Sequence, residues 1–265
     1  MKIGVIAGSG NLPVILTQQI KNAGNQVLVI SITKDANKSL KTLSTEFYEL
    51  GVGQIKKIIN TLLESDVSEM SIIGKISKDI LLNPLHLDTK AIKILCKLKD
   101  KSDASIFFAV AEEIGSSGIK LIDQRLYLSN LLPEKGVLTK HKPSHSQLLD
   151  VEYGISLAKN VAELGIGQTV VVKDQIILAI EAIEGTDEAI RRGGKLCNGG
   201  AVIAKSAKSN HDFRFDVPTI GPDTIDVLIE SKASVLAIEY GKAFLIEPEF
   251  TILKANEAKI AIVVV

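Results

Sequence analysis

The chain has 265 residues, of which 46% are hydrophobic and 23% charged, as in globular proteins that bury one large core or two smaller ones. Basic and acidic residues number 31 each, tryptophan is absent and aromatic residues make up 4%, which argues against nucleic-acid partners. The two cysteines lie far apart, and neither a signal-peptide pattern nor a bilayer-long apolar run occurs. We therefore expect a cytoplasmic protein without disulfides, either soluble or peripheral on a membrane.

The first half of the chain has the pattern of a parallel α/β domain. An apolar run ends in the loop Gly8-Ser9-Gly10-Asn11, Pro13 suits the first turn of a helix, and a second apolar run follows. This order predicts a βαβ unit and a Rossmann-like parallel sheet. The expected elements are strands at 2–7, 26–32 and 70–74, and helices at 14–23, 54–64 and 88–101.

The second half predicts a mixed α+β domain. Residues 130–143 lack periodicity and contain two prolines, so we place a linker at about 131–143, between domains at 1–132 and 133–265. Asp174-Gln175 separates two apolar runs and predicts a tight hairpin. The expected elements are strands at 168–173, 176–182, 201–205, 235–238, 244–246 and 260–265, and helices at 151–164 and 222–232.

Polar residues appear where two apolar segments end. Residues 176–180 predict a buried strand, and the stretch 181–187, with Glu184, Thr186 and Asp187, follows directly. Asp216 lies between Phe215 and Val217 in the same way. Carboxylates this close to a core are costly unless a metal, a cation or a ligand satisfies them, although those of 181–187 could instead cap a turn and the next helix. The basic residues between the two stretches favour a site; they are Lys205, Lys208 and Arg214.

Two loops of the first half are candidates for phosphate contact. The glycine loop 8–11 can point N–H groups at a phosphate at a helix N-terminus, or it can be only a tight structural turn. It is a weak dinucleotide fingerprint, because Pro13 replaces the third glycine and the second strand has no acidic residue at its end. Lys75 follows a predicted buried strand and either contacts phosphate or is simply solvated.

The predicted helix at 88–101 carries a basic stripe beside an apolar one. Such a stripe is either a solvated face or a surface that lies on anionic lipid. Its residues are Lys90, Lys93, Lys97 and Lys101. His141 and His145 flank Pro143 without the glutamate of a helical zinc motif, so we expect no metal there.

Several motifs stand in the order found in one family. They are IAGSGNLP at 6–13, GK at 74–75, GVLT at 136–139, GQ at 167–168, AIEGTD at 182–187 and RFDVPTIGP at 214–222. The chain thus resembles, over nearly its whole length, the LpxI-type UDP-2,3-diacylglucosamine pyrophosphatases of lipid A biosynthesis. The resemblance implies two domains with the glycolipid held between them, a homodimer, a divalent metal, normally Mg²⁺, and UMP and lipid X as products. Asp216 matches the essential aspartate of the family, whereas Lys101-Ser102-Asp103 replaces an expected Gly-Asp-Asp.

We therefore expect a metal-dependent pyrophosphatase in which Asp216 is the catalytic carboxylate and Asp216, Asp187 and Glu184 are the metal ligands. The alternatives are a non-catalytic nucleotide-sugar binding protein and an NAD-dependent oxidoreductase, which the loop sequence disfavours. The expected partners are the glycolipid nucleotide, a second copy of the chain and, transiently, the inner face of the cytoplasmic membrane. The expected substrate-binding residues are Gly8, Ser9, Gly10, Asn11, Lys75, Gln168, Thr186, Asp187, Lys205, Lys208, Arg214 and Thr219.

Overall fold

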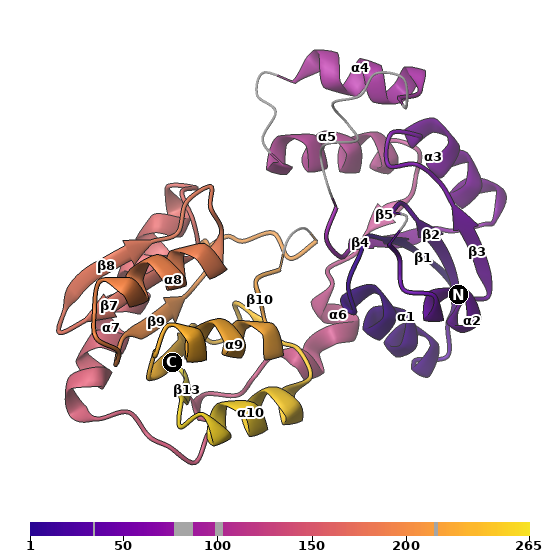
Figure 1. Cartoon of the computed structure of the whole chain (residues 1–265). Coiled ribbons are helices and arrows are strands. Elements are labelled where there is room, and N and C mark those ends of the chain that lie inside the picture. Colours follow the sequence, from indigo (N-terminus) through magenta and orange to yellow (C-terminus); the bar gives the residue numbers. More distant parts are fainter. Residues whose placement is uncertain (34, 77–86, 99–102, 215–216) are drawn as a thin grey trace. The chain divides into compact units, whose positions relative to one another are not determined.

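The computed structural model describes residues 1–33, 35–76, 87–98, 103–214 and 217–265. The contacts of the chain divide it into two compact units (Figure 1). Unit 1 comprises Met1–Ser129 and Asp212–Asp216, and unit 2 comprises Asn130–His211 and Val217–Val265. A short segment from the second half of the sequence therefore belongs to the unit formed by the first half.

Unit 1 is a parallel α/β domain, as the sequence predicts. Its strands are β1 (Lys2–Ala7), β2 (Gln26–Ser31), β3 (Glu46–Glu49), β4 (Glu69–Ile73) and β5 (Lys120–Leu121). Its helices are α1 (Leu12–Asn22), α2 (Ser39–Leu43), α3 (Ile55–Glu64), α4 (Thr89–Lys97), α5 (Asp103–Gly115) and α6 (Arg125–Leu128). The strands pair in parallel in the order β3-β2-β1-β4-β5, so the order reverses between β1 and β4, where α/β folds hold ligands.

Helix α3 shows how the sequence pattern produces the packing of unit 1. Ile55, Ile58, Ile59 and Leu62 follow the i, i+3, i+4, i+7 spacing, and each is at most 4% exposed. They form one cluster with sheet residues such as Met70. The apolar face of the helix is therefore covered by the sheet.

Unit 1 also departs from the prediction in places. Strand β3 is not among the expected elements, because it is short and only half-buried. Helix α5, which starts at Asp103, was implied by the family resemblance but not by the hydrophobic pattern. Helix α4 ends at Lys97 instead of residue 101, and residues 99–102 lie outside the described part. Lys90 forms an ion pair with Glu113 of α5, so it is not a freely solvated member of the basic stripe.

Unit 2 is a mixed α/β domain. Its strands are β6 (Gly136–Val137), β7 (Thr169–Lys173), β8 (Ile176–Ile180), β9 (Val202–Lys205), β10 (Thr219–Ile220), β11 (Val235–Ile238), β12 (Phe244–Leu245) and β13 (Ala261–Val264). Its helices are α7 (His145–Glu163), α8 (Thr186–Lys195), α9 (Pro222–Glu230) and α10 (Pro248–Glu257). The main sheet has the order β6-β13-β11-β9-β7-β8, in which β9, β11 and β13 are parallel and the other pairs are antiparallel. In the described part of the chain, no helix has both the length and the apolar character to span a bilayer.

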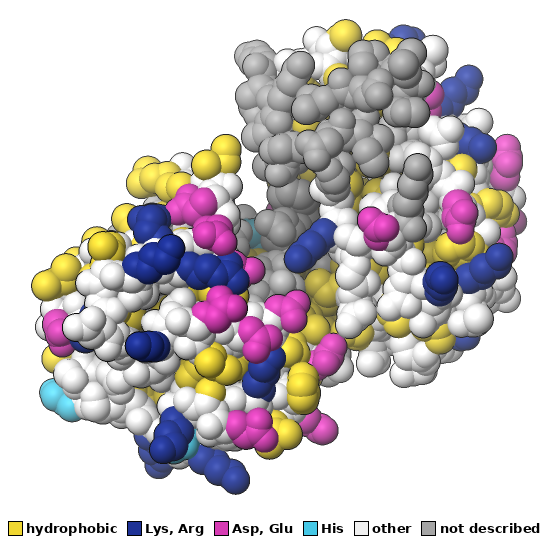
Figure 2. Space-filling view, in the orientation of Figure 1, with side chains coloured by type: hydrophobic (Ala, Val, Ile, Leu, Met, Phe, Trp, Pro, Cys, Tyr) yellow, Lys and Arg dark blue, Asp and Glu magenta, His cyan; other side chains and the backbone are white. Residues whose placement is uncertain are grey.

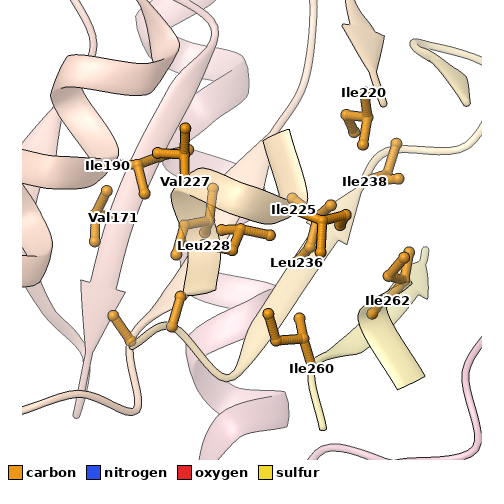
Figure 3. Packing of buried hydrophobic residues seen from close by; sticks show 14 of the residues in the cluster. Val171, Ile190, Ile220, Ile225, Val227, Leu228, Leu236, Ile238, Ile260 and Ile262 are labelled. Atoms are coloured by element: carbon orange, nitrogen blue, oxygen red, sulfur yellow. The ribbon is translucent and has the colours of Figure 1, made fainter. Parts of the chain in front are cut away.

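Alternate residues of the main sheet serve two different hydrophobic clusters. One cluster combines Val170, Val172 and Val202 with residues of α7. The other combines the intervening positions, such as Val171 and Ile203, with residues of α8, α9 and α10 (Figure 3). Because side chains alternate along a strand, these clusters lie on opposite faces of the sheet, with α7 on one face and the other three helices on the other.

The hairpin between β7 and β8 is confirmed, and its turn is held from α7. Asp174 and Gln175 have φ angles of 51° and 57°, as a two-residue hairpin turn of this kind requires. The buried carboxylate of Asp150 accepts hydrogen bonds from both of their N–H groups, at 3.0 and 2.7 Å. The prediction that β8 is buried was wrong at its start, since Ile176 is 63% exposed. The reason is that β8 is the outermost strand of the described sheet.

Helix α7 begins six residues earlier than the sequence pattern predicts. Ser144 accepts from the N–H of Gln147, and the Gln147 side chain accepts in return from the N–H of Ser144, which forms a capping box. This signal lies directly after the segment predicted as linker, and Gly136–Val137 of that segment pairs with β13. Part of the predicted linker is therefore ordered structure of unit 2.

We predict that Gly193→Ala destabilises unit 2 by about 1–3 kcal/mol, the usual cost of overpacking a core. A Cβ at Gly193 would lie 2.6 Å from Cγ1 of Val171, so α8 would have to move off the sheet. Urea unfolding measures the change. Gly115→Ala is the matched control, because a Cβ there meets nothing within 4 Å, and an equal loss from both variants would contradict the packing argument.

Candidate functional site

A buried lysine marks one edge of the main sheet of unit 2. Lys205, the last residue of β9, is only 6% exposed. Its Nζ donates to Oγ1 of Thr186 at 2.9 Å and lies 3.5 Å from Oγ1 of Thr169. Thr169 is the register partner of Lys205, and Thr186 is the first residue of α8, which follows β8. The neighbouring strands β9, β7 and β8 thus bring these groups together at the edge of the sheet formed by their ends.

A carboxylate completes this polar cluster. Oε1 of Glu181 accepts from the hydroxyl of Thr186 at 3.0 Å, and its Oε2 accepts from the N–H of Gln168 at 3.2 Å. A Cβ at Gly167 would lie 2.1 Å from the carbonyl oxygen of Glu181, so only glycine allows this approach. The structure therefore places Gln168, Thr186 and Lys205 together, as expected for a site. Glu181, which the sequence analysis left out of the candidate residues, joins them.

Glu184 and Asp187, two of the three expected metal ligands, lie near the start of α8, whereas the third, Asp216, lies outside the described residues. The carboxylate of Glu184 receives hydrogen bonds from Arg192 at 2.6 Å and from the N–H of Ala182 at 3.1 Å. The pKa of Glu184 lies below its usual value, chiefly because the bond from Arg192 stabilises the charged form. Asp187 is exposed in the first turn of α8, where a negative charge is favourable. Over the described ranges, no three or more His, Cys, Asp or Glu side chains come together as a group that could hold a metal ion.

The surface of α8 is covered by paired charges (Figure 2). Arg191 contacts both Glu188 and Glu230, and Arg192 contacts Glu184. These pairs are exposed, and such pairs contribute little to stability. We therefore assign Glu184 to this surface network and leave it out of the metal ligands proposed below.

A second polar cluster lies at the same edge of the sheet, on the face covered by α7. The buried Ser206 donates its hydroxyl hydrogen to Oε2 of Glu239, and Nζ of Lys159 lies 3.5 Å from Oε1 of Glu239. Glu239 directly follows the buried strand β11. Glu239 was not predicted as a site residue, although it shows the same signal as 181–187, a carboxylate at the end of an apolar strand.

The loop after β9 carries three further candidates. Lys208 is exposed, and its carbonyl oxygen accepts from Nζ of Lys242 at 3.0 Å. Arg214 belongs to unit 1 and forms a bidentate pair with Asp212, with contacts of 2.9 and 2.6 Å. Asp216, the expected catalytic carboxylate, and Phe215 lie outside the described residues. Thr219, in the short strand β10, is half-buried and pairs with Phe244.

The segment before Asp216 is attached to unit 1 through Phe213. This side chain is 6% exposed, and the Arg125 guanidinium lies 3.7 Å above its ring. The N–H of Gln124 donates to the Phe213 carbonyl oxygen at 3.1 Å. Asp123 orients Arg125 through contacts of 3.1 and 2.6 Å. Burial raises the pKa of Asp123, but the hydrogen bonds from Arg125 outweigh it, so the pKa lies below its usual value.

The glycine loop and Lys75 meet where the strand order of unit 1 reverses. The N–H of Gly8 donates to Ile73 at 2.8 Å, and the N–H of Ser9 donates to the carbonyl oxygen of Lys75 at 2.9 Å. A Cβ at Gly8 would lie 2.5 Å from that oxygen, which supports the structural reading of this glycine. These N–H groups are used within the protein, so the expected phosphate contact is left to Gly10, Asn11 and the exposed side chain of Lys75.

Comparison with known proteins covers both halves of the chain. The model of the LpxI N-terminal domain matches residues 2–131, and the model of the LpxI C-terminal domain matches residues 134–263. The UDP-2,3-diacylglucosamine pyrophosphatase LpxI of Caulobacter vibrioides is 28% identical over 97% of this chain and 94% of its own length.

The solved structures that were matched are distant. Glycinamide-RNase-transformylase T from Mycobacterium tuberculosis is 11% identical, with a TM-score of 0.27, over 69% of this chain and 44% of its own. The biotin carboxylase domain of a thermophilic 2-oxoglutarate carboxylase is 13% identical, with a TM-score of 0.28, over 74% and 33%. This chain spans less than half of either structure, and neither likeness carries an argument about fold or activity. The two domain models, in order and together covering almost every residue, show that the chain belongs to the LpxI family.

Proposed function

We propose that this protein hydrolyses UDP-2,3-diacylglucosamine to UMP and 2,3-diacylglucosamine 1-phosphate in lipid A biosynthesis. The match of both LpxI domain models along the chain carries the proposal, and the name of the Caulobacter relative supports it. One water adds across the P–O–P bridge, one bridging P–O bond breaks, and the hydrogens of the water end on the phosphate products or in solvent. The proposal includes a homodimer, which sedimentation of the purified chain measures.

The cluster around Lys205 supports a role in holding the substrate. Displacement at a diphosphate needs positive charge near the phosphate oxygens and a positioned water. Lys205 and the N-terminus of α8 supply positive charge at one edge of the sheet of unit 2. In the proposed reaction the ammonium of Lys205 binds a phosphate oxygen, and Asp216 orients the attacking water.

We predict that Asp216→Asn lowers UMP release by about 10² to 10⁴-fold, the range for the loss of a positioned acid–base group. The variant keeps the size of the side chain, so its circular dichroism spectrum and melting temperature should match the wild type. Asp223→Asn is the control, because Asp223 is an exposed aspartate of α9 in the same half of the sequence. Near-normal UMP release by Asp216→Asn would remove Asp216 from the mechanism. A wild type that binds the glycolipid without releasing UMP would favour the non-catalytic binding protein.

We further propose that Mg²⁺ is required, with Asp216 and Asp187 as ligands, since Mg²⁺ keeps most of its waters and needs only one or two carboxylates. EDTA should abolish UMP release and added Mg²⁺ should restore it. Asp187→Asn should raise the Mg²⁺ concentration for half-maximal activity about 10–100-fold, the usual effect of disturbing a metal site. Glu184→Gln should leave it unchanged, because Arg192 already holds that carboxylate. Full activity in EDTA would refute the metal requirement.

We also propose that α4 contacts the inner face of the cytoplasmic membrane. Lys93 and Lys97 are exposed on α4, and each lysine near an anionic surface contributes about 1 kcal/mol. Changing both to glutamine should weaken binding to vesicles containing anionic lipid and make that binding less sensitive to salt. The matched control changes Lys56 and Lys57, which are exposed on α3 of the same unit. An equal loss from both pairs of changes would show that α4 has no special role.

A further inference from the structure

The contacts of Lys205 and Thr186 fix the direction of a chain of hydrogen bonds. An ammonium group can only donate, so Oγ1 of Thr186 accepts from Lys205. A carboxylate can only accept, so Thr186 gives its single hydroxyl hydrogen to Oε1 of Glu181. The hydrogen bonds therefore run from Lys205 through Thr186 to Glu181, and the Thr186 hydroxyl has no hydrogen left to offer to a substrate.

The Glu181 end of this chain of hydrogen bonds is held by backbone groups. The N–H of Glu181 donates to the carbonyl oxygen of Thr169 at 2.9 Å, and Oε2 of Glu181 accepts from the N–H of Gln168. Gly167 allows the close approach of its segment to Glu181. The carboxylate is thereby held in one position relative to β7, the strand beside Lys205.

Burial explains why such a chain is needed. A charge that is almost completely removed from water is costly unless it is hydrogen-bonded and balanced by an opposite charge. Lys205 is 6% exposed, and Thr186 connects it to the negative charge of Glu181. Without the Thr186 hydroxyl, the ammonium would lose its contact at 2.9 Å and its hydrogen-bonded link to the charge of Glu181.

We propose that Glu181 and Thr186 are positioning residues, which hold the ammonium of Lys205 where it meets a phosphate of the substrate. This inference rests on the proposed function only for the identity of that substrate. It changes the role expected for Thr186, which acts through Lys205 instead of contacting the glycolipid.

The first test observes the ammonium directly and needs no activity. In protein labelled with ¹⁵N-lysine, the hydrogens of a buried and hydrogen-bonded ammonium exchange slowly with water, and the group gives a resolved NMR signal. The signal that disappears in Lys205→Met is that of Lys205. Thr186→Val keeps the shape but removes the hydroxyl, and should speed the exchange about tenfold, as expected for one lost hydrogen bond to a charged group. Thr186→Ser restores the hydroxyl and should restore slow exchange.

The matched control for this test is Thr251→Val. Thr251 is fully buried in the same unit, and its hydroxyl donates to the carbonyl oxygen of Ile246 at 2.7 Å. Its removal should leave the Lys205 signal unchanged, although it removes a hydroxyl that is even more deeply buried than that of Thr186. An unchanged exchange rate in Thr186→Val, or no slowly exchanging Lys205 signal in the wild type, would overturn the proposal.

The second test asks whether Thr186 acts through Lys205, by measuring kcat/KM for UMP release in a double-mutant cycle. Thr186→Val should lower kcat/KM about tenfold in the wild type but less than about twofold in the Lys205→Met background, because positioning has no effect once the ammonium is gone. Equal losses in both backgrounds would indicate a merely structural role. If the wild type releases no UMP while the exchange results hold, the proposed function fails and the positioning of Lys205 stands.

Discussion

The register of β9 with its two neighbours is the constraint on which the candidate site depends. Lys205 is paired with Thr169 on one side and with Ile238 on the other. A shift of one residue would turn every side chain of β9 to the other face, and the apolar clusters on both faces forbid it. The hydrophobic core therefore decides that the Lys205 side chain lies on the α8 face and that of Ser206 on the α7 face.

This arrangement gives one sheet edge two polar clusters with different chemistry. On the α8 face, hydroxyl groups separate Lys205 from the carboxylate of Glu181. On the α7 face, Glu239 contacts Ser206 and the partly exposed Lys159 directly. In the second cluster the opposite charges of Lys159 and Glu239 are in direct contact. In the first, the Thr186 hydroxyl lies between the ammonium of Lys205 and the carboxylate of Glu181.

The sequence predicted the architecture where one physical signal dominates. The βαβ opening, the parallel sheet of unit 1 and the hairpin at Asp174-Gln175 follow from strong hydrophobic periodicity and turn chemistry. The half-buried strand β3, the short strand β6 and helix α10 were not predicted, because their apolar patterns are weak. Pairing with β2 and β13, respectively, stabilises the two strands. The exposure of Ile176 could not be predicted either, since it depends on β8 being outermost in the described sheet.

The candidate site was predictable to a similar degree. Gln168, Thr186 and Lys205 each lie at or near the start or end of a strand, and the sequence predicts these strand ends. The three residues lie together because these strand ends are at the same edge of the sheet. The ion pair between Arg192 and Glu184 depends on side-chain directions. The hydrogen bond from the N–H of Gly8 to the carbonyl oxygen of Ile73 depends on how the loop closes. These can be read only in three dimensions. The role of Asp216 stays a prediction, because that residue lies outside the described ranges.

The insertion of Phe213 beside Arg125 has a consequence for how this family can be recombined. The two domain models meet between residues 131 and 134, which makes that point the natural place to exchange halves between relatives. Phe213 would then arrive from one parent, while Gln124 and Arg125 would come from the other. A chimera joined there keeps this contact only if Phe213 from one parent fits Gln124 and Arg125 from the other. The segment to exchange with the N-terminal half therefore includes Asp212–Asp216, which lies beyond the junction in sequence.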